Sequence, residues 1–317
     1  MRSSSVCFTL FALSTTLAAQ QASVSGVPAM GYALDPSARA LRPIWGIPRA
    51  ASAGEPIEAG FAIQSAVISS SGSYGLAIAG DGTLRLLTLS GPFSNVDVPV
   101  VGRAQALVRS PRGTAAAVLA ENWIGFMSGF SAGSSQVAGV PINTAPVQVS
   151  VSDDGAYLIA ALPDGSLEMF GRDGTQVPLS APAPISMVAF RPGDTDALAL
   201  SVDNRVWLIH QTSFAQIAGP GDGVSSSVGL GFLPDGNTAL IAGSSGTILT
   251  INVQSGAKSP VVCACAPSRL EPMAASGVFR LTSSWTEPQY MFDGASLQSF
   301  FVPAVPANNV HRRRPED

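Results

Sequence analysis

The chain has 317 residues, of which 46% are hydrophobic and only 12% are charged, and its formal net charge is −4. This composition excludes an intrinsically disordered chain, and the lack of a basic stripe argues against a nucleic acid partner, which would need many cations for its phosphates. The length would ordinarily indicate two domains, but single all-β domains also reach this size.

The first 19 residues predict an export signal. Arg2 is followed by the apolar segment Val6–Leu13 and by small residues that end at Ala18 and Ala19. A positive start, a short apolar run and a small-residue cleavage site are typical of a secretory signal peptide, and the apolar run is too short to span a bilayer. We therefore expect cleavage after Ala18 or Ala19, a secreted or periplasmic bacterial protein, and no membrane span.

Residues 20–64 predict a short hairpin. Tyr32–Leu34 and Arg39–Trp45 have strand composition, and Asp35–Ala38 between them is a turn. This hairpin is either a shortened copy of the unit that repeats farther along the chain, or a pair of strands that joins the two ends of the fold. Arg49–Gly60 is rich in Ala, Gly and Pro and is interpreted as a connecting loop.

Residues 65–302 contain one unit repeated six times. In each unit an apolar run, a turn and a second apolar run are followed by another turn and a third run; the copies are Val67–Leu89, Leu107–Met127, Val149–Phe170, Val188–Ile209, Leu230–Asn252 and Met273–Phe292. The equivalent first-turn positions are 39 to 42 residues apart and are Gly72, Gly113, Gly155, Asp194, Gly236 and Gly277. A weaker fourth strand follows most units, at Val137–Val140, Gln176–Leu179, Phe214–Ala218, Pro260–Cys265 and Leu297–Val302.

This repeat predicts an all-β fold, a β-propeller. A period of about 40 residues with four short strands is the signature of a propeller blade. The apolar runs are too short for helices and end at turn-forming residues. We predict seven blades of about 41 residues with the first one degenerate, or six blades as the alternative, in a monomer whose residues 303–317 form a solvated tail.

The first turns also carry a family resemblance. Ser110–Gly113 reads Ser-Pro-Arg-Gly, Ser152–Gly155 reads Ser-Asp-Asp-Gly, and Leu233–Gly236 reads Leu-Pro-Asp-Gly. These turns resemble those of the bacterial WD40-like propellers, which include the PD40/TolB-type and YVTN-type repeats. The resemblance implies the propeller fold, but that superfamily contains both binding modules and enzymes.

After removal of the signal only Cys263 and Cys265 remain. Residues two apart on a strand point to the same face, and this geometry suits a disulfide between them poorly. We interpret them as two small apolar residues of one unit, with a strained redox pair or a metal contact as alternatives.

The loops between the second and third strands of the blades predict one binding face. They bring carboxylates, tryptophans and one arginine to the same side of the ring, namely Asp81, Glu121, Trp123, Asp164, Asp203, Arg205, Trp285 and Glu287. Aromatic rings give contact area and carboxylates accept hydrogen bonds, so these residues are candidate ligand contacts. The alternative is that the acids are turn residues and that the tryptophans cap the blades.

The sequence offers little for catalysis. The histidines are His210, predicted on the opposite face, and His311 in the tail; no Gly-x-Ser-x-Gly, P-loop or His-Glu-x-x-His motif is present. We predict no catalytic residue, no metal site and no cofactor. The expected function is a non-catalytic binding module for a protein or a cell-surface glycan. The alternative is a lactonase-like propeller hydrolase, which would need Asp81, Glu121, Asp164 and Asp203 to converge within about 4–6 Å.

Overall fold

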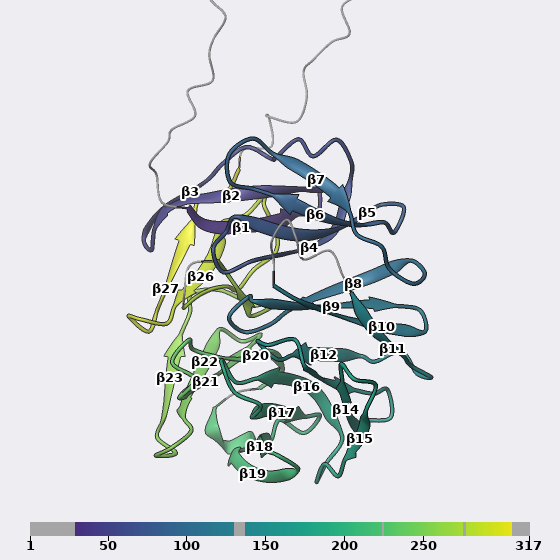
Figure 1. The fold of residues 1–317 in the computed structure, drawn as a ribbon. Coiled ribbons are helices and arrows are strands. Elements are labelled where there is room, and N and C mark those ends of the chain that lie inside the picture. Colours follow the sequence, from purple (N-terminus) through teal and green to yellow (C-terminus); the bar gives the residue numbers. More distant parts are fainter. Residues whose placement is uncertain (1–28, 130–136, 224, 275–276, 306–317) are drawn as a thin grey trace, which may run out of the picture.

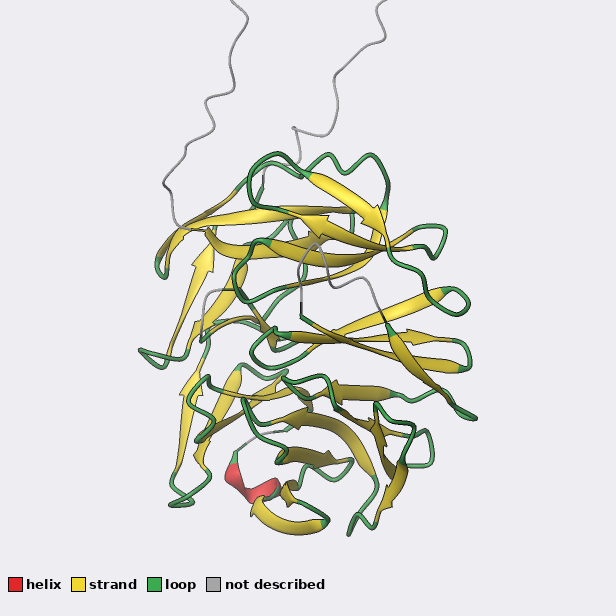
Figure 2. Ribbon diagram, viewed as in Figure 1, coloured by secondary structure: helices red, strands yellow, loops and turns green. Residues whose placement is uncertain are grey.

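The chain folds into a ring of seven antiparallel sheets (Figures 1 and 2). The computed structural model describes residues 29–129, 137–223, 225–274 and 277–305. Within these ranges the single helical element is the 3-10 helix Pro220–Asp222, and no helix is long and apolar enough to cross a bilayer. The prediction of a seven-bladed all-β propeller is therefore confirmed. The predicted signal peptide and most of the predicted tail lie outside the described residues.

Each sheet is one blade, built from consecutive strands. Blade 1 has three strands, β1 (Ala29–Asp35), β2 (Ala40–Ile47) and β3 (Ala50–Ala53). Blade 2 contains β4 (Ile63–Ile68), β5 (Tyr74–Ala79), β6 (Leu84–Thr88) and β7 (Ser94–Asp97). Blade 3 contains β8 (Ala104–Arg109), β9 (Ala115–Ala120), β10 (Trp123–Ser128) and β11 (Ala138–Pro141). Blade 4 contains β12 (Gln148–Val151), β13 (Tyr157–Ala161), β14 (Leu167–Gly171) and β15 (Gln176–Leu179).

The remaining blades follow the same order. Blade 5 contains β16 (Ile185–Phe190), β17 (Ala197–Ser201), β18 (Val206–His210) and β19 (Ser213–Ala218). Blade 6 contains β20 (Ser227–Phe232), β21 (Thr238–Gly243), β22 (Thr247–Asn252) and β23 (Lys258–Val262). Blade 7 contains β24 (Glu271–Pro272), β25 (Val278–Arg280), β26 (Gln289–Asp293) and β27 (Gln298–Val302).

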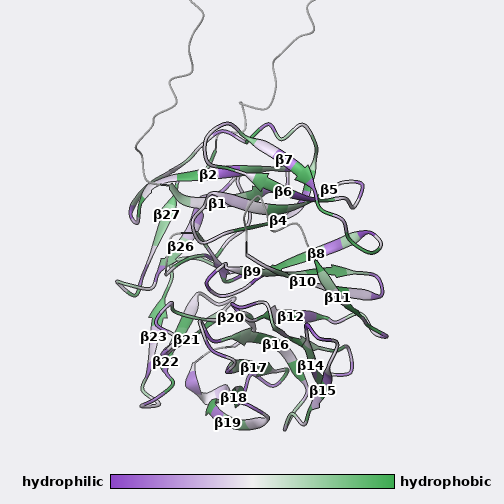
Figure 3. Cartoon of the chain, in the orientation of Figure 1, coloured by the Kyte–Doolittle hydropathy of each residue, from purple (hydrophilic) through white to green (hydrophobic). Residues whose placement is uncertain are grey.

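The middle strands supply the core because both of their faces are covered by neighbouring blades. In β21 the side chains of Ala239, Leu240, Ile241 and Ala242 are at most 1% exposed. A strand buried on both faces reads as a continuous apolar run rather than an alternating one. Figure 3 shows this hydrophobic colouring along the strands of the blades.

The first turn of each blade fixes the register of its two inner strands. In blade 6 the Leu233 N–H donates to the Thr238 carbonyl at 2.8 Å, and the Asp235 carboxylate accepts from the Asn237 N–H at 2.9 Å. Gly236 has φ +69°, a conformation that glycine adopts without strain. The same hydrogen bond, from the N–H of the first turn residue to the carbonyl of the residue five positions later, is present in blades 2 to 7. Its donors are Ser69, Ser110, Ser152, Arg191, Leu233 and Met273. This closure makes positions in different blades directly comparable.

The first blade is shorter than the others. The predicted strands of residues 20–64 are present as β1 and β2, but the prediction of a loop over Arg49–Gly60 was wrong in part, because β3 lies within it. Its Ala-Ala-Ser-Ala sequence has little strand propensity, and pairing with β2 overrides that weakness.

The ring closes by contact between blades 7 and 1, which lie side by side, and no described sheet mixes strands from the two ends of the chain (Figure 1). The Trp285 Nε1–H donates to the Leu34 carbonyl at 3.0 Å, and Arg280 donates to the same oxygen at 3.3 Å. Met30, Ile44, Met273 and Trp285 share one buried apolar cluster across this seam. Packing, these two hydrogen bonds and a third from Arg49 to Gln298 therefore join blades 1 and 7.

The two cysteines form a disulfide, so the expectation that their geometry suits one poorly was wrong. Strand β23 ends at Val262, and the chain bends immediately afterwards. The Cα atoms of Cys263 and Cys265 are consequently 5.1 Å apart. An extended strand would hold them about 6.7 Å apart, near the upper limit for a disulfide.

Candidate functional site

The inner strands of all seven blades surround a central cavity of about 890 Å³. Most of its wall is apolar, with Leu34, Val67, Leu107, Val149, Phe232 and Met273 among the lining residues. Cavities of this size and character commonly hold small organic ligands. The cavity is therefore large enough to be a binding site.

Polar side chains in blade 4 join it to blade 5. The Ser150 hydroxyl accepts the Phe190 N–H at 2.9 Å, and the Gln148 side-chain amide exchanges hydrogen bonds with the Val188 backbone at 2.7 and 3.1 Å. These groups hold two inner strands together where no backbone ladder joins the sheets. These hydrogen bonds connect the two blades within the protein itself.

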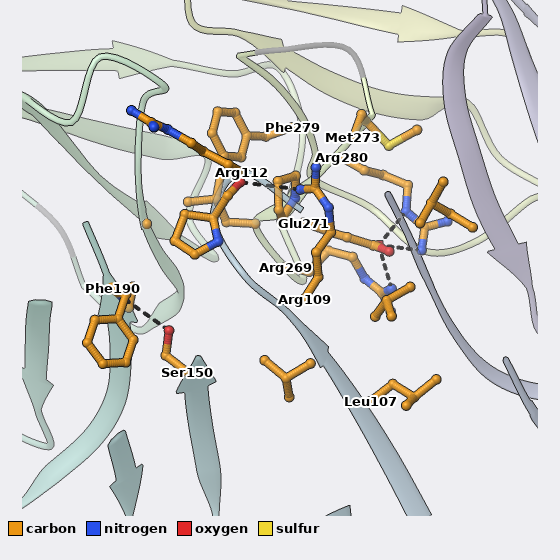
Figure 4. Close-up of a pocket in the computed structure, with 18 of the residues that line it drawn as sticks. Leu107, Arg109, Arg112, Ser150, Phe190, Arg269, Glu271, Met273, Phe279 and Arg280 are labelled. Atoms are coloured by element: carbon orange, nitrogen blue, oxygen red, sulfur yellow. Dashed lines mark hydrogen bonds and ion pairs between the residues drawn. The ribbon is translucent and has the colours of Figure 1, made fainter. Parts of the chain in front are cut away.

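A charged cluster from blades 3 and 7 lines the same cavity. Glu271 accepts hydrogen bonds from the Arg280 Nε at 2.9 Å and the Arg269 Nη1 at 3.2 Å, and it forms an ion pair with the Arg280 Nη2 at 2.7 Å. Arg280 is only 1% exposed. Figure 4 shows the guanidinium groups of Arg269 and Arg280 at the Glu271 carboxylate, with Arg109 beside them. Three arginines thus gather near one carboxylate.

The other blades have uncharged side chains at the equivalent positions. Arg109 immediately precedes the first turn, where blades 2, 4, 5 and 6 have Ile68, Val151, Phe190 and Phe232, each at most 8% exposed. Arg280 is paired with Glu271 across the inner strands, and its counterparts in blades 2 to 6 are Leu76, Ala117, Ile159, Leu198 and Leu240. The blade fold therefore does not require charges at these positions.

Arg109 has little compensation for its charge. Its Nε is buried without a hydrogen-bond partner among the described residues, and its Nη1 lies 3.5 Å from the Pro111 carbonyl oxygen. Burial lowers the pKa of Arg109 to about 10, against the opposing influence of Asp153 and Glu271. A Cβ atom at Gly113 would lie 2.3 to 2.6 Å from the guanidinium, so only glycine makes room for it there. The turn thus accommodates a guanidinium that the protein leaves partly unsatisfied.

Arg112, also at the cavity, has a different environment. Its backbone N–H and that of Gly193 both donate to Asp153 at 2.7 Å, and its Nε is 4.0 Å from the same carboxylate. The Arg112 guanidinium lies over Gly193 of blade 5. Arg112 and Asp153 therefore connect neighbouring turns.

Three carboxylates of the predicted binding face accept hydrogen bonds within their own turns. Hydrogen bonds from Thr83, Ser166 and Ser201 lower the pKa of Asp81, Asp164 and Asp203, respectively. Arg205 pairs with Asp203 at 3.0 Å. These three exposed acids thus make the hydrogen bonds of turn residues, and their role in ligand binding stays a prediction.

The tryptophans of that face have separate environments. Trp285 is 5% exposed and lies in the seam, where the Arg42 guanidinium carbon is 5.6 Å from its ring centroid. Trp123 lies against Gly125 and Gly139 of its own blade. Trp123 and Glu121 line a second cavity of about 790 Å³, whereas Glu287 is exposed and lines neither cavity. Of the eight residues predicted for the binding face, only Glu121 and Trp123 line the same cavity. None of the eight lines the central cavity.

His210 lies at the first-turn side of blade 5. Its Nδ1 is 2.7 Å from Asp196, whose other oxygen is 3.4 Å from Arg191. Across the described ranges, no three His, Cys, Asp or Glu side chains are grouped so that they could hold a metal ion.

Sequence reasoning missed the charged cluster because it searched the loops. The signal was present, since alignment on the first turns places Arg109 and Arg280 in columns that are otherwise apolar in most blades. Arg269 and Arg280 meet Glu271 within blade 7, whereas Arg109 of blade 3 joins the same cavity only through ring closure.

Comparisons with known proteins indicate the fold. No protein-family model matches the chain, and no curated protein matches it. The crystal structure of a functionally unknown protein from Desulfotomaculum acetoxidans DSM 771 is similar, with a TM-score of 0.61 and 12% sequence identity, covering 87% of this chain and 100% of that chain. At this identity the similarity shows a shared fold alone.

Proposed function

We propose that the protein is an exported, non-catalytic binding propeller whose ligand occupies the central cavity. The observation that carries this proposal is the placement of Arg109, Arg269, Glu271 and Arg280 at inner-strand positions that the other blades fill mainly with uncharged residues. Buried charge is costly, so charge that the fold does not need points to a ligand.

The arrangement favours binding over hydrolysis. Among the described residues that line the central cavity, Glu271 is the only carboxylate, and two arginines already bind it. No second carboxylate, histidine or cysteine of this described lining lies beside it to share acid–base work. The lactonase-like alternative has correspondingly less support.

Export, family and partners complete the proposal. The N-terminal signal and the Cys263–Cys265 disulfide support an oxidising compartment, either secreted or periplasmic. The Ser-Pro-Arg-Gly and Ser-Asp-Asp-Gly turns support membership of the bacterial WD40-like propellers. We propose a protein or cell-surface glycan as a larger partner, contacting the face that carries Glu121 and Trp123.

A thermal-shift screen of small metabolites, combined with lactone and ester hydrolysis assays, tests this function. A ligand that binds only the folded state raises Tm with its concentration. We expect such shifts without turnover, in the wild type and in Asp164→Ala alike. Lactone hydrolysis that disappears in Glu271→Gln would contradict the proposal and support the hydrolase.

A further inference from the structure

We propose that the central cavity binds an organic monoanion, a carboxylate with an apolar body, and that Arg109 receives the carboxylate group. This inference rests on the proposed function, because it names the ligand class of the same cavity. It depends on the charge balance of the cavity, the free donors of Arg109 and the apolar wall.

The charge balance favours an anion. Arg269 and Arg280 share the Glu271 carboxylate, and within the described part of the chain no carboxylate lies within 4.0 Å of Arg109. The cavity is therefore locally cationic, although the whole chain has a net charge of −4. An anion in the cavity would supply the missing counter-charge.

The donors of Arg109 are held in place before any ligand arrives. The guanidinium rests over Gly113 and has one long contact, 3.5 Å, to the Pro111 carbonyl. Its Nε–H is buried without a partner among the described residues, which is a costly state for a donor. A carboxylate matches the planar guanidinium with two parallel hydrogen bonds.

Glu271 weakens the attraction of the site for an anion. It is close enough for its charge to raise the pKa of Arg109 against the effect of burial. Its repulsion of an anion beside Arg109 scales with the charge of that anion, and so does the attraction by the arginines. The single guanidinium of Arg109 and one carboxylate group match in charge and in geometry.

The cavity wall favours an apolar body. Leu107 belongs to the same strand as Arg109, and Val149, Phe232 and Met273 line the cavity from other blades. Phe190 also lines it, and Figure 4 shows this ring on the wall with Leu107. An alkyl or aryl group would bury apolar surface here at about 25 cal/mol per Å². A short-chain or aromatic carboxylate combines the two requirements.

Isothermal titration of the full-length exported protein with octanoate tests the proposal. Octan-1-ol and octylamine have the same apolar body with neutral and cationic heads. We expect octanoate to bind at least about tenfold more tightly than octan-1-ol, and octylamine to bind more weakly than either, because a charge-assisted hydrogen bond is lost. Equal affinity for octanoate and octan-1-ol would overturn the proposal.

The variant Arg109→Gln tests whether the carboxylate of the ligand binds at Arg109, and Arg172→Gln is its matched control. Arg172 is an exposed arginine that donates to Ser128 at 2.9 Å and does not line the cavity. We expect Arg109→Gln to lose at least about tenfold in octanoate affinity with no loss of Tm in the absence of ligand, since an uncompensated buried charge is removed. Arg172→Gln should retain wild-type affinity.

Two results separate this inference from the proposed function. Octanoate binding that survives in Arg109→Gln, or a lower Tm of that variant without ligand, would assign Arg109 a structural role and overturn the inference alone. If the metabolite screen identifies only neutral or cationic ligands, the binding function stands and the anion assignment fails. If no ligand binds the cavity, both fail.

Discussion

Blade 5 and blade 7 use the same backbone frame for different purposes. Both close their first turn with the same hydrogen bond, from Arg191 to Asp196 and from Met273 to Val278. At one paired position of the inner strands, however, blade 5 has Ala189 opposite Leu198, whereas blade 7 has Glu271 opposite Arg280.

This difference teaches that the turns and strand pairing specify the blade, and that the inner side chains are free to serve another role. In blade 5 those side chains stabilise the ring by packing. In blade 7 they place charge on the central cavity, and the compensation comes from a carboxylate and from the carbonyl of Leu34 in blade 1. Mutations should therefore affect the two blades in different ways.

The largest effect is expected in the apolar blade. Phe190→Ala removes a ring that is 1% exposed, which should lower the free energy of unfolding by about 4 kcal/mol through lost burial and a cavity. Urea denaturation measures this change. Phe301→Ala is the matched control, because Phe301 is 56% exposed and should change stability by less than about 1 kcal/mol. Similar losses in both variants would show that the inner strand of blade 5 is not the core.

In blade 7, we expect one substitution to lower the free energy of unfolding and a second substitution to restore much of it. Arg280→Leu should cost about 3 kcal/mol, because a partly buried carboxylate loses the closer of its two arginine partners and the Leu34 carbonyl loses a donor. Glu271→Val with Arg280→Leu recreates the apolar pair Val67 and Leu76 of blade 2, and should restore much of this loss. Chemical denaturation of the two singles and the double variant gives the coupling energy. A double variant less stable than either single variant would show that the ion pair is required by the fold.

The seam between blades 7 and 1 should add a pH dependence that the apolar inner strands of blade 5 lack. In the seam, burial raises the pKa of Asp35, but hydrogen bonds from Ser37, Arg42 and Ala38 outweigh it and lower the pKa overall. A carboxyl with a lowered folded-state pKa stabilises the fold above its unfolded pKa, about 3.9, and this contribution is lost as the pH falls through the folded value.

Asp35→Asn should therefore cost about 2 kcal/mol at pH 7, because Arg42 keeps its charge in a buried site without its carboxylate partner at 2.6 Å. The difference from the wild type should shrink as the pH falls below about 4. Urea denaturation at pH 7, 5, 3.5 and 2.5 measures it. A difference that is constant over this range would exclude ionisation of Asp35 as the cause, and Phe190→Ala provides the comparison that should not depend on pH.

The smallest effect is expected at the disulfide of blade 6. Cys263→Ser with Cys265→Ser opens a loop of three residues, and loop-closure entropy predicts a loss of about 1.5 kcal/mol. Thermal unfolding with and without reductant should show the same loss in the reduced wild type. No response of the wild type to reductant would argue against a disulfide that contributes to stability.

The sequence predicted the fold well because turn chemistry repeats. Gly72, Gly113, Gly155 and Gly236 occupy the same left-handed turn position in the structure, and the outer strand Gln176–Leu179 has the predicted bounds. Strand β3 was missed because its Ala-Ala-Ser-Ala sequence carries no local signal and is fixed by pairing.

The candidate site was harder to predict for a physical reason. Arg109 and Glu271 are far apart in the sequence and line the same cavity only when the ring closes, and a single arginine at the end of an apolar run looks like an ordinary strand terminus. The carboxylates of the turn loops were conspicuous instead, although local hydrogen bonds account for Asp81, Asp164 and Asp203.

A crystal structure of the protein soaked with 8-bromooctanoate tests the central claim most directly. The anomalous signal of bromine locates the alkyl end, and the electron density locates the carboxylate. The account predicts bromine inside the central cavity and the carboxylate within hydrogen-bond distance of the Arg109 guanidinium. A ligand outside the cavity, or one in the cavity whose carboxylate points away from Arg109, would contradict it.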